Sequence, residues 1–165
     1  MQKILVSRCL LGHAVRYDAG SHGPFDLLQQ WQAEGRVVAL CPEVAGGLPI
    51  PRPAAEIAGG QGALVLDGLL PVLTESGEDV TAAFLKGGAE AVRLVQLHGI
   101  RMAVLKARSP SCGNLQNYDG SFSGRKVVGV GVTAAALQRQ GVHVFNEEQL
   151  VQAQAFLLQL EAQQS

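Results

Sequence analysis

Three short apolar runs along the chain each lead into a turn that holds a cysteine, and this recurrence limits the available folds more than any other feature. Short runs rich in Val, Ile and Leu, bounded by turn-forming residues, are typical of buried strands. The sequence has three cysteines in all, so every cysteine follows a predicted strand. The strands are predicted at residues 3–8, 36–40 and 100–105, and the cysteines are Cys9, Cys41 and Cys112.

Helical patterns separate these strands, and a fourth strand follows near the end of the chain. Apolar residues recur at spacings of three and four in the longest helical segment, 80–98, as they do on one face of a helix. Strands that alternate with helices predict an α/β fold: a Rossmann-like, three-layer domain with a mostly parallel sheet and helices on both faces. At 165 residues, we expect a single domain spanning 1–165. The helices are expected at residues 24–34, 80–98, 133–141 and 146–164, and the fourth strand at 142–145.

Residues with known preferences for helix ends punctuate these segments. Pro favours the first turn of a helix, Ser, Thr, Asp and Asn favour the N-cap, and Gly favours the position just after the end. The expected starts are Pro24, Asp79 or Thr81, Thr133 and Asn146, and the expected stops are Gly35 and Gly99.

Three segments carry turn signals instead of a regular period. Residues 41–62 hold four prolines and five glycines, which predicts an irregular loop. Residues 63–74 have apolar runs on either side of Asp67-Gly68, which predicts a β-hairpin. The polar, glycine-rich part of residues 104–124, around Cys112, predicts a long functional loop that lacks regular structure.

Composition excludes several classes of protein. Apolar residues make up 47% and charged residues 16%, so the chain has the means to fill a core and is not disordered. The net charge of −1 and the absence of basic clusters argue against a nucleic-acid or membrane-surface partner. We also find neither an apolar run of membrane-spanning length nor a signal peptide, and therefore expect a cytoplasmic protein whose cysteines are thiols, ligands or redox groups.

The carboxyl ends of parallel strands share one edge of a sheet, where ligands bind, so we expect the three cysteines to gather there. Each cysteine taken alone is equally well explained as a small buried hydrophobe. A structural zinc site prefers four ligands with paired spacing, which this chain lacks. A cysteine nucleophile needs a base, and no local pattern recommends one of the four histidines, His13, His22, His98 and His143. Three thiolates on a four-iron cluster would leave one iron open, and this fits the count better than zinc.

Three long motifs, in this order, resemble the signature blocks of the thiouracil desulfidase family. The resemblance covers most of residues 4–145 and keeps all three cysteines. Small departures are Arg8 where we expect Ala, Ala19 where Gly is usual, and a variant form of the Pro-rich motif at residues 51–57. The motifs are SRCLLGHAVRYDAG (7–20), CPEVAGGLPIPRPAAEI (41–57) and LKARSPSCGNLQNYDGSFSGRKVVGVGVTAAAL (105–137).

The resemblance implies an enzyme that removes sulfur from thiolated pyrimidines such as 2-thiouracil, giving the oxo base and hydrosulfide. It implies an oxygen-sensitive [4Fe-4S] cluster held by Cys9, Cys41 and Cys112, with the substrate sulfur on the fourth iron. Such an iron acts as a Lewis acid that polarises the C–S bond. The implied partner is a small-molecule thiolated pyrimidine. Neither a membrane nor intact nucleic acid is expected as a partner, and the sequence leaves the oligomeric state open.

Candidate roles can be assigned around this cluster. Glu43, two residues after Cys41, is our first choice as the general base, and its alternative is a carboxylate that orients the loop. Ser109, with Glu43, is assigned to catalysis, where it would hold the attacking water or a ring atom; its alternative is a bond to the backbone of its own turn. Lys106 would stabilise a developing anion, and its alternative is a strand-end lysine that reaches solvent. Further candidates for substrate binding are Ser111, Asp119 and Ser121, for which a hydrogen bond to the local backbone or a plain turn is the alternative. Tyr17, Tyr118 and Phe122 are candidates for ring stacking, with packing as the alternative.

Two charge pairs are expected to orient loops, Arg16 with Asp18 after the first cysteine and Arg52 with Glu56 after the second. The glycines of residues 127–137 do not complete a dinucleotide fingerprint, so NAD is rejected. Two other functions stay open at this point. One is a metal-free hydrolase with a cysteine nucleophile, and the other is a non-catalytic module that binds a metal or a modified base.

Overall fold

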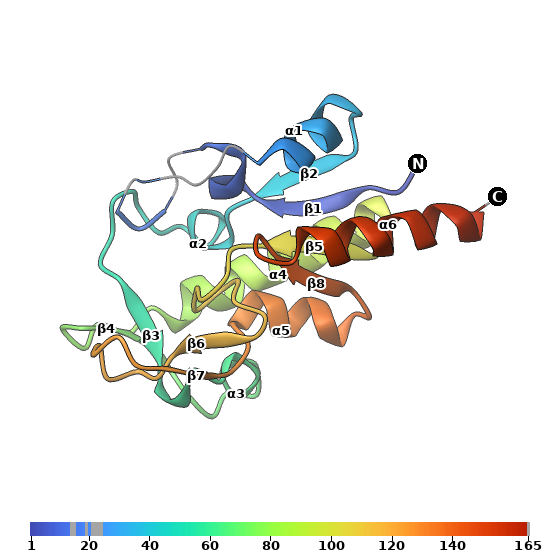
Figure 1. The fold of residues 1–165 in the computed structure, drawn as a ribbon. Coiled ribbons are helices and arrows are strands. Elements are labelled where there is room, and N and C mark those ends of the chain that lie inside the picture. The colour runs from blue at the N-terminus through green and yellow to red at the C-terminus, as the bar shows by residue number, and fades with distance from the viewer. Residues whose placement is uncertain (14–15, 19, 21–24, 165) are drawn as a thin grey trace.

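A four-stranded parallel sheet forms the centre of the computed structural model, which describes residues 1–13, 16–18, 20 and 25–164 (Figure 1). The strands are β1 (Ile4–Ser7), β2 (Val37–Leu40), β5 (Met102–Leu105) and β8 (His143–Asn146), and their order in space is β2-β1-β5-β8. Each of the four was predicted. The chain moves from β1 to β2 on one side and later returns to β5 on the other side. The boundary between β1 and β5 is therefore the switch point of the sheet, and open α/β sheets bind ligands at the carboxyl ends of the strands at this point.

Alternating side chains of the strands pack against helices on both faces of the sheet. Ile4 and Val6 of β1 contact the helices α1 (Asp26–Ala33) and α6 (Leu150–Gln164) in one apolar cluster. Leu5 lies in a second cluster, with α4 (Thr81–His98) and α5 (Val132–Arg139). This arrangement confirms the predicted three-layer α/β class. Among the described residues, no helix combines the length and the apolarity that a membrane span requires.

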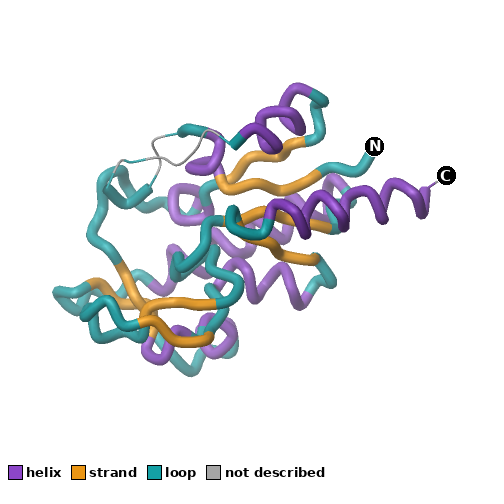
Figure 2. The backbone as a smooth tube through the Cα atoms, viewed as in Figure 1, coloured by secondary structure: helices purple, strands orange, loops and turns teal. Residues whose placement is uncertain are grey.

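Two small antiparallel sheets lie beyond the carboxyl ends of the main strands, on the opposite side of the molecule from the two chain termini (Figure 1). One pairs β3 (Ala55–Ile57) with β4 (Val72–Thr74), and the other pairs β6 (Gln116–Tyr118) with β7 (Lys126–Val128). Figure 2 shows that much of the loop structure gathers at this same end. Residues 41–62 and the polar part of residues 104–124, both predicted to lack regular structure, therefore contain short strands.

Short helical segments complete this end of the molecule. The turn η1 (Arg8–Leu11) follows β1, and α2 (Pro42–Ala45) follows β2 with a proline in its first turn. The segments η2 (Ala58–Gly60) and α3 (Gly62–Leu66) lie between β3 and β4.

The hairpin predicted at residues 63–74 was wrong. Asp67-Gly68 ends helix α3, because Gly68 has a φ of 76°, the left-handed conformation in which glycine closes helices as readily as it closes hairpins. Val65 of α3 is completely buried, so packing decides in favour of the helix. β4 pairs with β3 instead.

The helix-end signals were partly right. Gly99 closes α4 with a φ of 63°, and Asp79 accepts the backbone N–H of Thr81 at 2.9 Å. Thr133 is not a cap, because α5 begins after Gly131. Asn146 ends β8 and accepts the N–H of Glu148 at 2.8 Å in the turn before α6, so it is not the cap either. Pro24 lies outside the described residues.

Candidate active site

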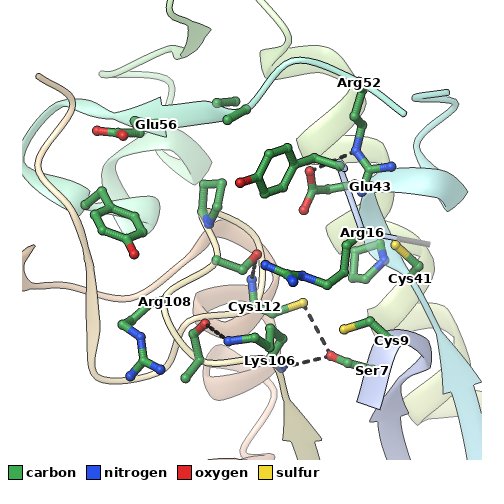
Figure 3. A pocket seen from close by; sticks show the side chains of 18 of the residues that line it. Ser7, Cys9, Arg16, Cys41, Glu43, Arg52, Glu56, Lys106, Arg108 and Cys112 are labelled. Carbon is green, nitrogen blue, oxygen red and sulfur yellow. Dashed lines mark hydrogen bonds and ion pairs between the residues drawn. The ribbon is translucent and has the colours of Figure 1, made fainter. Parts of the chain in front are cut away.

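A cavity of about 400 Å³ opens at the carboxyl ends of β1, β2 and β5, and all three cysteines line it (Figure 3). Cys9 lies in η1, Cys41 lies between β2 and α2, and Cys112 lies in the turn after β5. The expected gathering of the cysteines at one sheet edge is therefore observed. Figure 3 shows the sulfur atoms of Cys9 and Cys112 turned toward one another across part of this space.

The three cysteines are free thiols, and burial opposes the ionisation of two of them, Cys9 and Cys112. Burial raises the pKa of Cys9 to about 11, with a further increase from Cys41 that Lys106 and Arg16 partly offset. Burial also raises the pKa of Cys112; a hydrogen bond from Ser7 lowers it, whereas the charges of Cys41 and Cys9 raise it. The thiols thus lie close enough to influence one another, and a cation that binds all three would favour the thiolate forms.

Two serines, Ser109 and Ser7, hold the turn that carries Cys112. The Oγ of Ser109 accepts the backbone N–H groups of Ser111 and Cys112, both at 3.1 Å. The hydroxyl of Ser7, from the end of β1, donates to the sulfur of Cys112 at 3.6 Å. The bond of Ser109 to its own turn, expected as an alternative, is therefore present.

Glu43 lies on the wall of the cavity and is bonded to both an arginine and Ser109. Its Oε1 accepts the Nε–H of Arg52 at 3.2 Å, and the exposed fractions of the two side chains are 18% for Glu43 and 3% for Arg52. Burial raises the pKa of Glu43, while the charge of Arg52 and hydrogen bonds from Arg52 and Ser109 oppose this increase. Glu43 and Ser109, the two residues predicted for catalysis, therefore meet at one point of the cavity.

Lys106 reaches the cavity from the end of β5 and is fixed by a second carboxylate. Its Nζ forms an ion pair with Glu147 at 2.9 Å and donates to the carbonyl of Ala107. The other carboxylate oxygen of Glu147 accepts the backbone N–H of Ala107 at 2.7 Å. Burial raises the pKa of Glu147, but the Ala107 N–H and Lys106 outweigh it and the net pKa is lowered.

Three other predicted binding residues do not line this cavity. Ser111 is fully buried, and its hydroxyl bonds to that of Thr133 at 2.7 Å. Asp119 and Ser121 bond to each other through Oδ1 and Oγ at 2.5 Å, in a turn of the loop between β6 and β7. We therefore assign them no contact with a ligand.

The aromatic candidates do line the cavity: Tyr17, Tyr118 and Phe122 all face it. Phe122 has a φ of 57°, which is uncommon for a residue other than glycine. The Oε1 of Glu56 accepts the N–H of Phe122 at 3.2 Å and the N–H of Gly120 at 3.0 Å. Glu56 thus holds this loop.

The predicted loop-orienting pairs differ in their outcome. Arg16 and Asp18 approach to 3.9 Å. Arg52 pairs with Glu43, and the hydrogen bonds found for Glu56 go to the β6–β7 loop. The expected Arg52–Glu56 pair is therefore replaced by a pair within the cavity wall.

The histidines take no part in this site within the described residues. None of the three described histidines, His13, His98 and His143, lines the cavity. The Nδ1 of His13 accepts a hydrogen bond from Arg8, His98 is exposed at the end of α4, and the ring of His143 contacts that of Phe156 at 4.3 Å. His22 lies outside the described residues.

Two contacts at the cavity were not predicted from the sequence, those of Ser7 and Glu147. Ser7 is 105 residues from Cys112, and Glu147 is 40 residues from Ala107. The one available signal was their position at the ends of strands, because Ser7 closes β1 and Glu147 directly follows β8. Strand ends in a parallel sheet are where such residues meet.

The donor set fits an iron–sulfur cluster. Thiolates are the ligands these clusters use, and hydrogen bonds to sulfur together with nearby cations stabilise the thiolate form. Here three cysteines border one cavity, Ser7 donates to one of them, and Lys106 and Arg16 lower the pKa of another. In the described part of the chain, no three His, Cys, Asp or Glu side chains are grouped for a single metal ion.

Fold and site together define an α/β protein with a three-cysteine site at the switch point of its parallel sheet. The chain belongs to the 2-thiouracil desulfurase family, whose model matches residues 4–149. This confirms the family resemblance derived from the three motifs.

Two known proteins are similar over nearly their whole length. A solved structure titled [4Fe-4S]-dependent thiouracil desulfidase TudS matches with a TM-score of 0.86 and 49% identity, over 96% of this chain and 99% of that one. The uncharacterized protein YbbK of Bacillus subtilis (strain 168) is 43% identical over 147 residues, which are 89% of this chain and 97% of YbbK.

Proposed function

We propose that this protein is an iron–sulfur-dependent desulfidase that converts thiolated pyrimidines of the 2-thiouracil type into the oxo base and hydrosulfide. The observation that carries this proposal is the convergence of Cys9, Cys41 and Cys112 on one cavity. Family membership and the similarity to a [4Fe-4S]-dependent thiouracil desulfidase support both the reaction and the cofactor.

In this proposal the three cysteines hold a [4Fe-4S] cluster. When bound, the cluster would supply a Lewis-acidic iron with an open position for the substrate sulfur. The protein supplies the remaining parts of the reaction: a base for water, charge for the anion that develops, and a wall for the ring.

Glu43 is the proposed base. Water adds its oxygen to the thiocarbonyl carbon, and its proton passes to the carboxylate of Glu43. Replacement of sulfur by oxygen leaves the oxo base, hydrosulfide and one proton. Burial keeps the pKa of Glu43 above that of an ordinary glutamate, which makes it a stronger base, while Arg52 and Ser109 oppose full neutralisation. Ser109 is bonded to Glu43 and is suited to orienting the water.

Lys106 is the proposed partner for negative charge on the pyrimidine. Its ammonium group is held by Glu147 and the carbonyl of Ala107, so it requires little reorganisation during the reaction. The rings of Tyr17, Tyr118 and Phe122 offer faces for the pyrimidine.

The geometry argues against the two alternatives. A nucleophilic cysteine is favoured by a lowered pKa, but burial raises the pKa of Cys9 and of Cys112. No histidine among the described residues lines the cavity to pair with a thiolate. A module that only binds a ligand has no need for a buried carboxylate bonded to a serine beside the three thiols.

The test is anaerobic purification followed by iron and sulfide analysis and incubation with 2-thiouracil. We expect a brown protein with broad visible absorption that releases uracil and hydrosulfide in equal amounts. Single Cys→Ser variants at residues 9, 41 and 112 should each lose the cluster and the activity. Full turnover by colourless protein after chelation of iron would contradict the proposal.

A cytoplasmic location and a small-molecule substrate complete the proposal. Three free thiols suit a reducing compartment. The net charge of −1 supplies no basic excess for intact nucleic acid. We further propose that residues 1–165 act as a single domain.

A further inference from the structure

We propose that Ser7 is a positioning residue that donates a hydrogen bond to the thiolate of Cys112 and so raises the reduction potential of the cluster bound there. The inference rests on the proposed function for the presence of the cluster. It assigns a role to a residue outside the three cysteines and the base.

Two contacts fix the direction of the hydrogen bond. The Oγ of Ser7 accepts the backbone N–H of Lys106 at 3.0 Å and lies 3.6 Å from the sulfur of Cys112 (Figure 3). A hydroxyl group has one proton to donate and oxygen lone pairs to accept with. Because the Lys106 N–H has no acceptor function, it uses a lone pair of Ser7. The hydroxyl proton is then free to point at the sulfur.

The position of Ser7 is set by the sheet on both sides. Ser7 ends β1, which pairs with β2 on one side and β5 on the other, and it lies opposite Leu40 in the register. It is two residues after Leu5, so its side chain lies on the face of the sheet that packs against α4 and α5, the face to which Cys112 also belongs. The rigid sheet thus holds the donor in place.

Burial strengthens the hydrogen bond between Ser7 and the Cys112 sulfur. Ser7 is 2% exposed and Cys112 is 5% exposed, so water does not compete for the hydroxyl proton. Burying a hydroxyl without an acceptor costs free energy, and within the described part of the chain the Ser7 hydroxyl has the Cys112 sulfur as its acceptor. A hydrogen bond to an ionised sulfur in such surroundings is stronger than one to a neutral thiol.

The chemical effect follows from charge. Reduction adds an electron to the cluster and increases the negative charge on its ligand sulfurs. A donor at the Cys112 sulfur stabilises this more negative state and therefore raises the potential. The same donor withdraws charge from the thiolate, which leaves the iron atoms better able to accept electron density from a substrate sulfur.

The test is a reductive titration of anaerobically reconstituted holoenzyme. In Ser7→Ala, we expect unchanged iron and sulfide content. The ratio of reduced to oxidised cluster at a fixed potential should fall about tenfold, which is a decrease of about 59 mV in the midpoint potential. This is the size expected for the loss of one hydrogen bond to a charged group. Ser7→Thr keeps the hydroxyl and should retain the original potential.

Ser111→Ala is the matched control. Ser111 is also buried and adjoins Cys112, but its hydroxyl bonds to Thr133 and not to sulfur. Its removal should leave the potential unchanged. A Ser7→Ala holoenzyme with the original potential would overturn the inference, as would an equal shift in Ser111→Ala.

If Ser7→Ala does not retain its cluster, the unaltered holoenzyme decides. Exchange into D₂O should shift the iron–thiolate bands of its resonance Raman spectrum, because the proposed bond places an exchangeable proton on a ligand sulfur. Bands that do not move would overturn the inference. A protein that binds no iron after reconstitution would contradict the proposed function itself, so the two failures are distinguishable.

Discussion

Glu43 and Arg52 form a buried ion pair on the wall of the three-cysteine cavity, with 3.2 Å between Oε1 and Nε. They are nine positions apart in the chain, and the Pro-rich loop between them brings them together. The Glu43 carboxylate is thus mostly shielded from solvent, while the charge of Arg52 favours its ionised form. This balance makes Glu43 suitable as a base next to the cysteines.

Glu43→Gln should keep the cluster and lose most of the turnover. The amide preserves size and accepts the hydrogen bond from Arg52, but it cannot take a proton from water. We expect kcat to fall by about 10²–10⁴-fold, the range for loss of a positioned base. Rates of uracil release per cluster, with iron analysis of each preparation, would measure this. Glu75→Gln changes an exposed carboxylate of the same cavity and serves as the control. Unaltered activity in Glu43→Gln would remove Glu43 from the role of base.

Arg52→Met should destabilise the protein through the charge it leaves behind. The Arg52 side chain is 3% exposed, so its loss strands the Glu43 carboxylate in a buried position. Removal of one partner of a buried pair costs about 3–5 kcal/mol, and we expect a value near the lower limit because Glu43 retains some access to water. Urea denaturation would measure it. Adding Glu43→Gln to Arg52→Met should restore part of the loss, and strictly additive effects would argue against the pair.

Arg16→Met is the control for that experiment. Arg16 also lines the cavity, but its pair with Asp18 is 3.9 Å long and both side chains are partly exposed. Such pairs contribute about 0–1 kcal/mol. If Arg16→Met lost as much stability as Arg52→Met, the loss would come from removing a positive charge from the cavity and not from breaking the buried pair.

The part of the site that lies at the ends of strands could be predicted from the sequence. Each cysteine follows an apolar run, and parallel strands bring their carboxyl ends to one edge, so local patterns sufficed to bring Cys9, Cys41 and Cys112 together. The position of Glu43 at the cavity could be predicted because it is two residues after Cys41. The strands β3, β6 and β7 were not predicted, because three residues are too few to show a period. β4 lies in the predicted hairpin, but its partner is β3.

Contacts between distant residues were the other part that could not be predicted. Asp67-Gly68 carries the same signal for a hairpin and for the end of a helix, and only the burial of Val65 decides between them. Arg52 had two carboxylates within reach along the chain, Glu43 and Glu56, and in the folded protein it pairs with Glu43. Such choices depend on which elements pack together, which local sequence does not contain.

Gly87→Ala should destabilise the protein and displace the segment that carries Glu43. A Cβ at Gly87 would overlap the carbonyl oxygen of Pro42, where α4 packs against α2, the segment that carries Glu43. Neither backbone can yield without moving the loop after Cys41. We expect a loss of at least about 1–3 kcal/mol in the free energy of unfolding, the cost of overpacking, together with weaker retention of the cluster. Urea denaturation and iron content would measure these effects.

Gly88→Ala provides a control in the same helix. A Cβ at Gly88 would meet its nearest neighbours at 3.7–3.8 Å, which is ordinary contact. Because alanine is favoured over glycine in a helix by about 0.8–1.0 kcal/mol, this variant should match or exceed the original stability. Equal effects of the two substitutions would mean that the close approach of α4 to Pro42 is not rigid.

Glu147→Ala should lower stability at neutral pH and less so in acid. The substitution leaves the Ala107 N–H without its acceptor and the Lys106 ammonium without its partner, and we expect a cost of about 1.5–3 kcal/mol at pH 7, typical of a hydrogen bond to a charged group. The pKa of Glu147 is lowered in the folded protein, so the unfolded chain binds its proton first as the pH falls. The contribution of Glu147 is therefore complete above its ordinary pKa of 4.5 and is lost as the pH falls through the folded value.

Urea denaturation of both proteins between pH 7 and pH 3 would test this dependence. The difference in stability should be constant at the upper end and shrink below pH 4.5. Glu148→Ala is the matched control, because the adjacent Glu148 side chain is 59% exposed and pairs with Arg108 at the surface, where the expected contribution is about 0–1 kcal/mol. A difference for Glu147→Ala that does not change with pH would mean that packing, and not the charge of the carboxylate, holds Lys106 and the Ala107 backbone at the edge of the cavity.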